Sequence, residues 1–339
     1  MKLYMENGYV NIQGILSENL PFNFVIGGRG TGKTYTTLKT AVEEKRIFMF
    51  MRRTQAQADL INKPEFSPFK AYNRDSGNVI FSKPLTKYNS GFFRHDDSAN
   101  DDVLIGYATA LSTISNIRGF DASDVDLLIY DEFIPERHER PIKNEGAAFL
   151  NAYETVNRNR ELKGKPPLQV ICLANANDIG NPIFLELGLI SDAEKMLRAG
   201  QEQKINKDRG IGLFMINNSP ISEKKRNTAL YKLTNGSEFE RMSICNEFTN
   251  ADYSNVIKRP LIEYIPIVAV GEICIYRHKS NGRLYVSTHT TGSPPKYSAG
   301  ENDRLRYARR YSWIWLEYLG GNIEFESVLC EVLLTKCHS

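Results

Sequence analysis

The most constraining feature of the chain is a segment near its start, Gly-Gly-Arg-Gly-Thr-Gly-Lys-Thr, which runs from Gly27 to Thr34. It has the spacing of a phosphate-binding loop, in which glycines let backbone N–H groups wrap closely around phosphate oxygens. Such a loop lies between a strand and a helix, and the apolar run 22–26 and the helical pattern 34–45 supply both. We therefore expect ATP to bind along the whole loop, with a chance glycine-rich turn as the alternative. The expected ligands are Gly27, Gly28, Arg29, Gly30, Thr31, Gly32, Lys33, which reaches the β- and γ-phosphates, and Thr34, which offers a hydroxyl to Mg²⁺.

Two acidic residues follow another apolar run. Residues 125–130 form a strand candidate, and Asp131 and Glu132 come directly after it. An aspartate at the end of such a strand can hold the water shell of Mg²⁺, and the next glutamate can polarise the attacking water. Adjacent carboxylates also occur on ordinary surfaces, but the phosphate-binding loop upstream favours the catalytic interpretation. The pair predicts an ATP hydrolase rather than a kinase or a GTPase switch.

A polar residue also follows the next predicted strand along the chain. Residues 168–174 are apolar and are followed by Asn175. In hydrolytic P-loop enzymes a side chain at this position senses the γ-phosphate, which makes Asn175 a candidate. Asparagine is equally favoured in turns, so both interpretations stay open.

Several arginines are candidates to complete the site. Arg158 and Arg160 close the predicted helix 145–161, and because they are two residues apart, at most one would cross a subunit interface. An arginine supplied by a neighbouring subunit stabilises the transferring phosphoryl group and raises the rate by about 10³–10⁵. Basic residues at a helix end are also favoured by the helix dipole alone. Arg118 is a second candidate, and Arg29 is a further basic group near the phosphates.

The order of predicted elements is that of an α/β protein. Short apolar runs alternate with helical stretches, which predicts a mainly parallel sheet covered by helices. The strand candidates are 22–26, 47–51, 103–111, 125–130 and 168–174, and the clearest helices are 34–45 and 145–161. At 339 residues we expect two domains. We interpret 1–195 as a P-loop ATPase domain of the ASCE type, 196–245 as a connecting region, and 246–339 as a smaller, β-rich C-terminal domain.

The connecting region and the second domain have patterns of their own. We expect a polar amphipathic helix over 191–207 and a strand over 212–217. Strands are then predicted at 262–270, 273–278 and 283–289, with a hairpin turn at 279–282 and a final helix over 303–319. The acidic residues of this part lack the spacing of a metal-dependent nuclease, in which several carboxylates converge on metal ions. We expect the second domain to be inactive as a nuclease.

Composition argues against several classes of protein. The five cysteines are scattered without a CxxC pair, which argues against a disulfide framework and against a zinc site. A signal-peptide pattern and any apolar run of about 18 residues are absent, so we expect a cytosolic protein without membrane contact. The net charge of +3 does not by itself indicate a nucleic-acid binder. Residues 201–339 carry 19 Lys and Arg against 15 Asp and Glu, which weakly favours a polyanion there.

Five segments together resemble one family. They are residues 23–34 with the loop, Met-Arg-Arg at 51–53, Ile-Tyr-Asp-Glu-Phe-Ile at 129–134, Thr-Val-Asn-Arg-Asn-Arg-Glu at 155–161 and Ile-Cys-Leu-Ala-Asn-Ala at 171–176. This set resembles the DNA-packaging ATPases of phi-29-like bacteriophages, compact relatives of the large terminases. The resemblance covers most of residues 20–185, and it is specific in the Asp-Glu-Phe-Ile and Arg-Asn-Arg-Glu segments.

The resemblance implies a function and a set of partners. It implies a homo-oligomeric ring of five subunits that docks on the portal vertex of an empty prohead in the host cytoplasm and pumps double-stranded DNA inward. It leaves open a structural packaging RNA between motor and portal. By position, Arg158 matches the trans-acting arginine of the family, whereas Arg118 falls where the family has a trans-acting lysine. The second domain of the family is similar to an RNase H-type nuclease without its catalytic carboxylates.

Contacts to DNA phosphates require basic side chains but no base reading. Two groups of residues and one loop are eligible, although each could equally be a solvated face: Lys224, Lys225 and Arg226; Arg304, Arg306, Arg309 and Arg310; and residues 137–143. Because duplex DNA exposes no base faces, the interleaved aromatic side chains are expected in the core or at subunit contacts. These are Tyr307, Tyr311, Trp313 and Trp315.

Other functions remain open on the sequence. Within enzymes, they are a terminase-like ATPase with an active nuclease domain and a helicase-type motor, although residues 200–339 contain no second P-loop-like half. From a different class, the chain could be a portal-docking assembly factor whose ATP site only switches its conformation. A glutamate beside Asp131 has little purpose in a protein that only binds nucleotide, which favours the motor.

Overall fold

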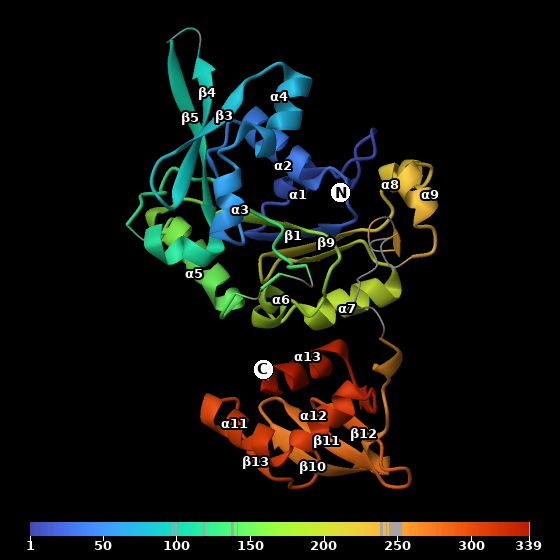
Figure 1. Ribbon diagram of the computed structural model, residues 1–339. Helices are drawn as coiled ribbons and strands as arrows, with labels where there is room; N and C mark the ends of the chain where they lie inside the picture. The colour runs from blue at the N-terminus through green and yellow to red at the C-terminus, as the bar shows by residue number, and fades with distance from the viewer. Residues whose placement is uncertain are drawn as a thin grey trace. The chain divides into compact units, whose positions relative to one another are not determined.

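The computed structural model describes residues 1–96, 98, 100–117, 119–136, 139–140, 142–237, 240–241, 243 and 253–338 (Figure 1). The chain divides into two compact units. The N-terminal unit consists of Met1–Leu187 with Met196–Thr249, and the C-terminal unit of Gly188–Lys195 with Asn250–Ser339. None of the helices in the described residues is long and apolar enough to cross a membrane.

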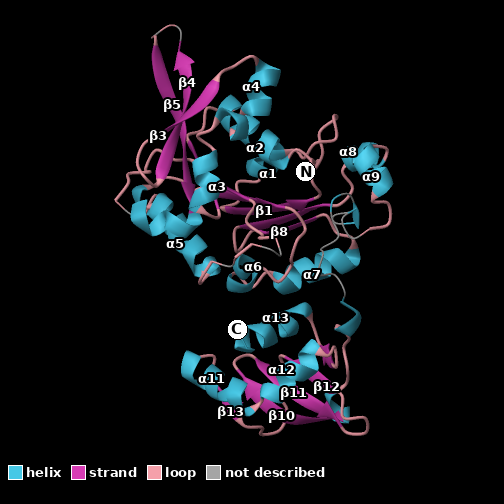
Figure 2. Ribbon diagram, viewed as in Figure 1, coloured by secondary structure: helices cyan, strands magenta, loops and turns pink. Residues whose placement is uncertain are grey.

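The N-terminal unit is built on a nine-stranded sheet with the order β3-β4-β5-β2-β6-β7-β1-β9-β8 (Figure 2). The strands from β5 to β9 in that order pair in parallel, while β3, β4 and β8 extend the two sides with antiparallel pairing. The expected α/β class with a mainly parallel sheet is confirmed. The strands are β1 (Phe22–Gly27), β2 (Phe48–Arg52), β3 (Ile80–Pro84), β4 (Asn89–Asp96), β5 (Asp101–Ala110), β6 (Leu127–Asp131), β7 (Gln169–Ala174), β8 (Gln203–Asn206) and β9 (Ile211–Ile216).

The central strands are apolar along their whole length because both faces of the sheet are covered. On one face, Val25 of β1 shares a core with Ile15 and Leu38. On the other face, the ring of Phe24 lies 5.5 Å from that of Phe184. The helices of this unit are α1 (Ile12–Ser17), α2 (Lys33–Glu43), α3 (Gln55–Leu60), α4 (Lys70–Ser76), α5 (Glu145–Asn157), α6 (Pro182–Glu186), α8 (Pro220–Arg226) and α9 (Ala229–Leu233). In Figure 1, α1, α2 and α4 lie on one side of the sheet and α5 and α6 on the other.

The region after residue 190 differs from the prediction. Helix α7 (Ile190–Ala199) ends well before 207, because Gly200 takes the left-handed conformation with φ 63° and the chain turns into β8. Strands β8 and β9 form a hairpin, and β9 pairs with the P-loop strand β1. Residues 203–216 are therefore part of the large sheet and not of a connecting region. The antiparallel strands β3 and β4 were also not predicted.

The C-terminal unit is built on a second, smaller sheet with the order β13-β10-β11-β12-β14. Its strands are β10 (Tyr264–Val270), β11 (Ile273–His278), β12 (Leu284–Ser287), β13 (Lys296–Tyr297) and β14 (Ile323–Phe325), and its helices are α11 (Glu301–Arg310), α12 (Ser312–Leu319) and α13 (Val328–His338). The predicted hairpin is present, with Gly282 at φ 74°. The single helix predicted over 303–319 is broken at Tyr311, and α13 was not predicted.

Candidate functional site

The strand order brings the predicted site residues to one edge of the large sheet. Strand β7 lies between the P-loop strand β1 and the Asp131 strand β6, and all three run in parallel, so their carboxyl ends meet. A cavity of about 370 Å³ opens at this edge. Its lining residues are Arg29, Gly30, Gly32, Lys33, Thr34, Tyr35, Asp131, Glu132, Ala174 and Asn175.

The loop glycines are required by the backbone and by close neighbours. Gly30 and Gly32 have φ 72° and 84°, a conformation that side chains rarely adopt. A β-carbon on Gly27 would lie 2.7 Å from the side chain of Ile216 on the adjacent strand. The hydroxyl of Thr31 donates a 3.0 Å hydrogen bond to a carbonyl within the loop and so holds its curvature. Helix α2 begins at Lys33, directly after the loop.

Lys33 is buried at the base of the loop. Its Nζ donates hydrogen bonds to the carbonyl oxygens of Gly27 at 2.7 Å and Gly28 at 2.9 Å, and to Oδ1 of Asn175 at 3.3 Å. Burial lowers the pKa of Lys33 to about 7, opposed by the nearby carboxylate of Asp131. A phosphate group would be a much stronger partner for this ammonium than neutral carbonyls are.

The side-chain oxygen atoms of Thr34 and Asp131 lie close together, where they could bind the same metal ion. The Thr34 hydroxyl lies 3.1 Å from both carboxylate oxygens of Asp131, which is 4% exposed. A hydroxyl and a carboxylate fit Mg²⁺, which binds proteins through one or two such groups and completes its shell with water and substrate phosphates. Within the described ranges, no cluster of three or more His, Cys, Asp or Glu could hold a metal by itself. The residues present therefore fit a Mg²⁺ that arrives with the nucleotide.

Glu132 is held by Arg52, which has no catalytic motif of its own in the sequence. Strand β2 pairs with β6, which places Arg52 at the end of β2 beside the two acidic residues. Its guanidinium lies 3.4 Å from Oδ2 of Asp131 and forms an ion pair with Glu132. Glu132 itself has φ 58°, which costs about 1–3 kcal/mol and persists only where the surroundings impose it. Partial burial raises the pKa of Glu132, and the charge of Arg52 opposes that shift.

Asn175 and Arg29 both line the cavity. Asn175 lies at the tip of β7 and accepts a hydrogen bond from Lys33, so its side chain faces the loop, as a γ-phosphate sensor requires. Arg29 donates at 2.5 Å to Glu136, which follows the acidic pair in the chain.

The position of Arg52 could have been inferred from the sequence had the pairing of β2 with β6 been known. Arg118 lies outside the described residues.

The two arginines after α5 occupy different environments. Helix α5 begins beside the carboxyl end of β6, where Glu145 accepts from Tyr130, and ends beside the start of β6 and β7. Arg160 is 8% exposed and donates to the carbonyls of Val125 and Pro166. The Arg158 side chain is 35% exposed, contacts Asp121 at 3.6 Å and donates to two backbone carbonyls. Both arginines therefore lie at the sheet edge opposite the P-loop of their own chain.

The basic residues proposed for DNA contact and the aromatic residues between them also have different surroundings. Lys225 contacts the P-loop, and Arg226 lies 3.7 Å from Glu223. Arg304 donates to the carbonyl of Lys336, Arg306 pairs with Asp303, and Arg310 lies over the ring of Tyr311. Tyr307 and Tyr311 are buried, as expected for core residues. In the loop 137–143, residues 137, 138 and 141 lie outside the described part of the chain.

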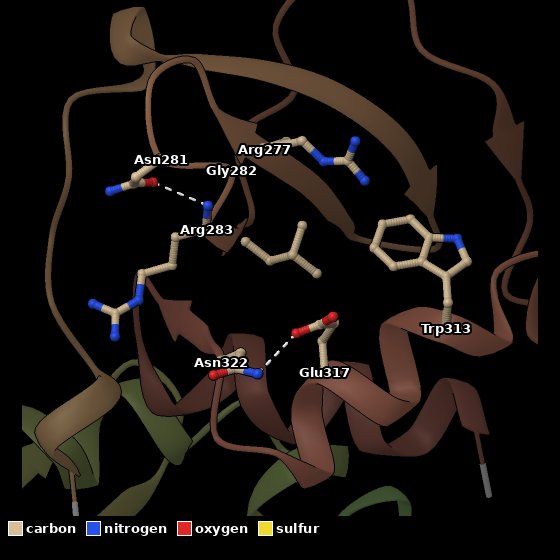
Figure 3. Close-up of a pocket in the computed structure, with 8 residues that line it drawn as sticks. Arg277, Asn281, Gly282, Arg283, Trp313, Glu317 and Asn322 are labelled. Atoms are coloured by element: carbon tan, nitrogen blue, oxygen red, sulfur yellow. Dashed lines mark hydrogen bonds between the residues drawn. The ribbon is translucent and has the colours of Figure 1, made fainter.

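A second cavity, of about 450 Å³, lies in the C-terminal unit beside the β11–β12 hairpin and α12 (Figure 3). Arg277 lies over the ring of Trp313 at 5.2 Å, and Asn322 donates to Glu317 at 2.9 Å. Its described lining holds one carboxylate, Glu317, whereas a two-metal nuclease requires several. Nearby, Arg283 pairs with the buried Glu324 at 2.9 Å.

Comparison with known proteins identifies relatives. The family model of the podovirus DNA encapsidation protein (Gp16) matches residues 5–297. The DNA packaging protein of Bacillus phage phi29 is 28% identical over 256 residues, which cover 74% of this chain and 69% of the relative. That of Bacillus phage B103 is 31% identical over 241 residues, covering 70% and 67%. The fold is similar to a chain of the bacteriophage Phi-29 viral genome packaging motor assembly, with a TM-score of 0.67 at 23% identity, covering 99% of this chain and 100% of the other.

Proposed function

Because the chain belongs to the podovirus DNA encapsidation protein (Gp16) family, we propose that it is the ATP-driven motor that moves double-stranded viral DNA into a preformed prohead. The observation that carries the proposal is the meeting of Lys33, Thr34 and Asp131 at one sheet edge with Glu132 beside them. This set has the parts that phosphoryl transfer from ATP to water requires.

Each residue at this edge has a role in hydrolysis. Lys33 binds the β- and γ-phosphates, and Thr34 and Asp131 hold Mg²⁺, which when bound neutralises charge on the phosphate oxygens. Glu132 orients the attacking water and accepts its proton. Arg52 contacts both carboxylates, so it keeps Glu132 ionised and fixes where its carboxylate lies. Asn175 links Lys33 to the γ-phosphate position.

Arg158 completes the site of a neighbouring subunit. It lies at the sheet edge opposite its own P-loop, so it does not serve the nucleotide of its own chain. Its partly exposed guanidinium can leave the backbone carbonyls that it contacts and reach across an interface. The motor is then a homo-oligomeric ring, of five subunits by resemblance to the family, in which each ATP is hydrolysed between two neighbours. Arg118 would act with Arg158 in the same interface.

The remaining partners follow from the packaging role. The ring docks on the portal vertex of the prohead in the host cytoplasm, with a structural packaging RNA as a further component, and grips DNA through phosphate contacts. An active nuclease is disfavoured, because the buried carboxylate of Glu324 is occupied by Arg259 at 2.8 Å and Arg283 at 2.9 Å. These arginines lower the pKa of Glu324 and already satisfy its carboxylate, which leaves it poorly suited to hold a metal ion.

ATP turnover measured with and without duplex DNA and purified proheads tests the proposal. We expect slow turnover by the chain alone and strong stimulation when DNA and proheads are both present, because the ring forms on the portal. The same turnover with and without these partners would contradict the packaging role, even if the chain hydrolyses ATP.

A further inference from the structure

Helix α8 delivers a lysine to the phosphate-binding loop from a part of the chain far from it in sequence. Nζ of Lys225 donates a hydrogen bond to the carbonyl oxygen of Arg29 and lies directly over Gly30, where any β-carbon would collide with it. The neighbouring Lys224 is exposed. The three basic residues of this helix therefore do not form one surface patch, and Lys225 contacts the phosphate-binding loop.

The position of α8 is fixed by the N-terminal segment of the chain. Ser219, the residue before α8, donates at 2.8 Å to the carbonyl of Gly8. A β-carbon on Gly8 would lie 3.0 Å from the backbone nitrogen of Ile221, so the two segments are in close contact. Two residues further on, the N–H of Val10 donates at 3.1 Å to the carbonyl of Thr31 in the loop. The same segment thus contacts both α8 and the loop, so the position of Lys225 next to the loop is fixed by the fold.

The charge of Lys225 is not offset by an acidic partner among the described residues, where it forms no ion pair. Arg29, on the phosphate-binding loop itself, is paired with Glu136. Burial lowers the pKa of Lys225, and its charge contributes to the lowered pKa of Lys33. Two partly desolvated ammonium groups facing one loop are unfavourable unless an anion binds between them.

We propose that Lys225 is a second phosphate-binding cation of the ATP site and that it links the occupancy of the site to helix α8. Gly30, which lines the cavity of the proposed ATP site, lacks the β-carbon that would collide with this ammonium, so Lys225 can lie against the loop. This inference rests on the proposed ATP site but assigns a residue and a coupling beyond it.

Binding of ATP, ADP and AMP to the full chain, measured by calorimetry, tests the assignment. We expect Lys225→Ala to weaken ATP and ADP binding about tenfold, as loss of one charge-assisted hydrogen bond requires, and to leave AMP binding unchanged. Lys225→Arg should retain most of the affinity, and the exposed Lys224→Ala is the matched control. Unchanged ATP affinity in folded Lys225→Ala would overturn the inference, as would an equal loss for all three nucleotides. Absence of ATP binding by the unaltered chain would instead contradict the proposed function.

Chemical labelling gives a second readout that does not depend on a variant folding. Acetic anhydride modifies unprotonated amines, and mass spectrometry reports the rate at each lysine. We expect ATP to slow the modification of Lys225 several-fold and to leave Lys224 unaffected. Equal rates at Lys225 with and without saturating ATP would overturn the assignment.

Discussion

At the residue scale, we expect the charge of Lys33 to depend on bound nucleotide. Its ammonium donates hydrogen bonds to two loop carbonyls and to the side-chain oxygen of Asn175. Burial lowers the pKa of Lys33 from its ordinary value near 10.5 to about 7. Phosphate oxygens stabilise the charged form and therefore raise the pKa of Lys33 when nucleotide binds. We therefore expect the site to take up a proton when ATP binds at a pH above about 7.

Proton uptake on ATP binding is a direct consequence. At pH 8 the free chain holds Lys33 largely unprotonated and the bound form holds it protonated, while the phosphates of ATP are already ionised. We expect calorimetry in buffers of different ionisation enthalpy to show uptake of up to about one proton, and affinity that falls as pH rises above 7. In the Lys225→Arg variant the side chain at position 225 stays charged at this pH, so the uptake by Lys33 should be retained. ATP binding without proton uptake at pH 8 would contradict the assigned environment of Lys33.

At the scale of elements, the turn after α5 gives different environments to two arginines that look alike in sequence. Arg160 is buried and donates to the carbonyls of Val125 and Pro166, so it fixes the end of the helix. Arg158 is partly exposed at the same end. A helix that starts at the catalytic edge and ends at the opposite edge can carry a group from one subunit toward the nucleotide of the next.

Substitution of the two arginines should therefore affect different properties, stability for Arg160 and ATP turnover for Arg158. Arg160→Ala leaves buried carbonyls without a donor and should lower the free energy of unfolding by about 1–3 kcal/mol in denaturant titration. Arg158→Ala should leave stability nearly unchanged but lower ATP turnover on proheads by about 10³-fold or more. Subunits with Arg158→Ala and subunits with Asp131→Asn should partly restore turnover when mixed, because some interfaces then hold both intact residues. A mixture that hydrolyses no ATP would contradict action in trans.

Much of this edge could be predicted from sequence because local signals specify it. The P-loop motif and the apolar strand before Asp131 are each contiguous in sequence, so the strands and the helix that carry them were predicted, while the roles of their residues stay predictions. Arg52 and Lys225 could not be assigned to the site, because each depends on a non-local pairing, β2 with β6 and α8 with the loop. The strand β9 was predicted, but its place beside β1 depends on sheet topology in the same way. The break at Tyr311 falls where the charged helix α11 gives way to the more apolar helix α12, and no glycine or proline marks it in the sequence.

At the scale of the whole molecule, the two units divide the work of the motor. The N-terminal unit holds every residue proposed for hydrolysis in its own chain. The C-terminal unit holds a buried carboxylate satisfied by two arginines and a polar cavity with a single acid, neither of which resembles metal-dependent cleavage chemistry. We therefore still expect this unit to be inactive as a nuclease and to contact other components of the assembly.

DNA packaging by proheads, measured as DNA protected from added nuclease, tests the central claim most directly. The comparison is between the unaltered chain, Glu132→Gln and the exposed control Glu154→Gln, at equal ATP concentration. We predict protected DNA with the unaltered chain and the control, and none with Glu132→Gln, which should still bind ATP but hydrolyse it about 10²–10⁴-fold more slowly. Packaging by Glu132→Gln without ATP turnover would contradict the account, because the ATP site would then act as an assembly switch and not as the source of motion.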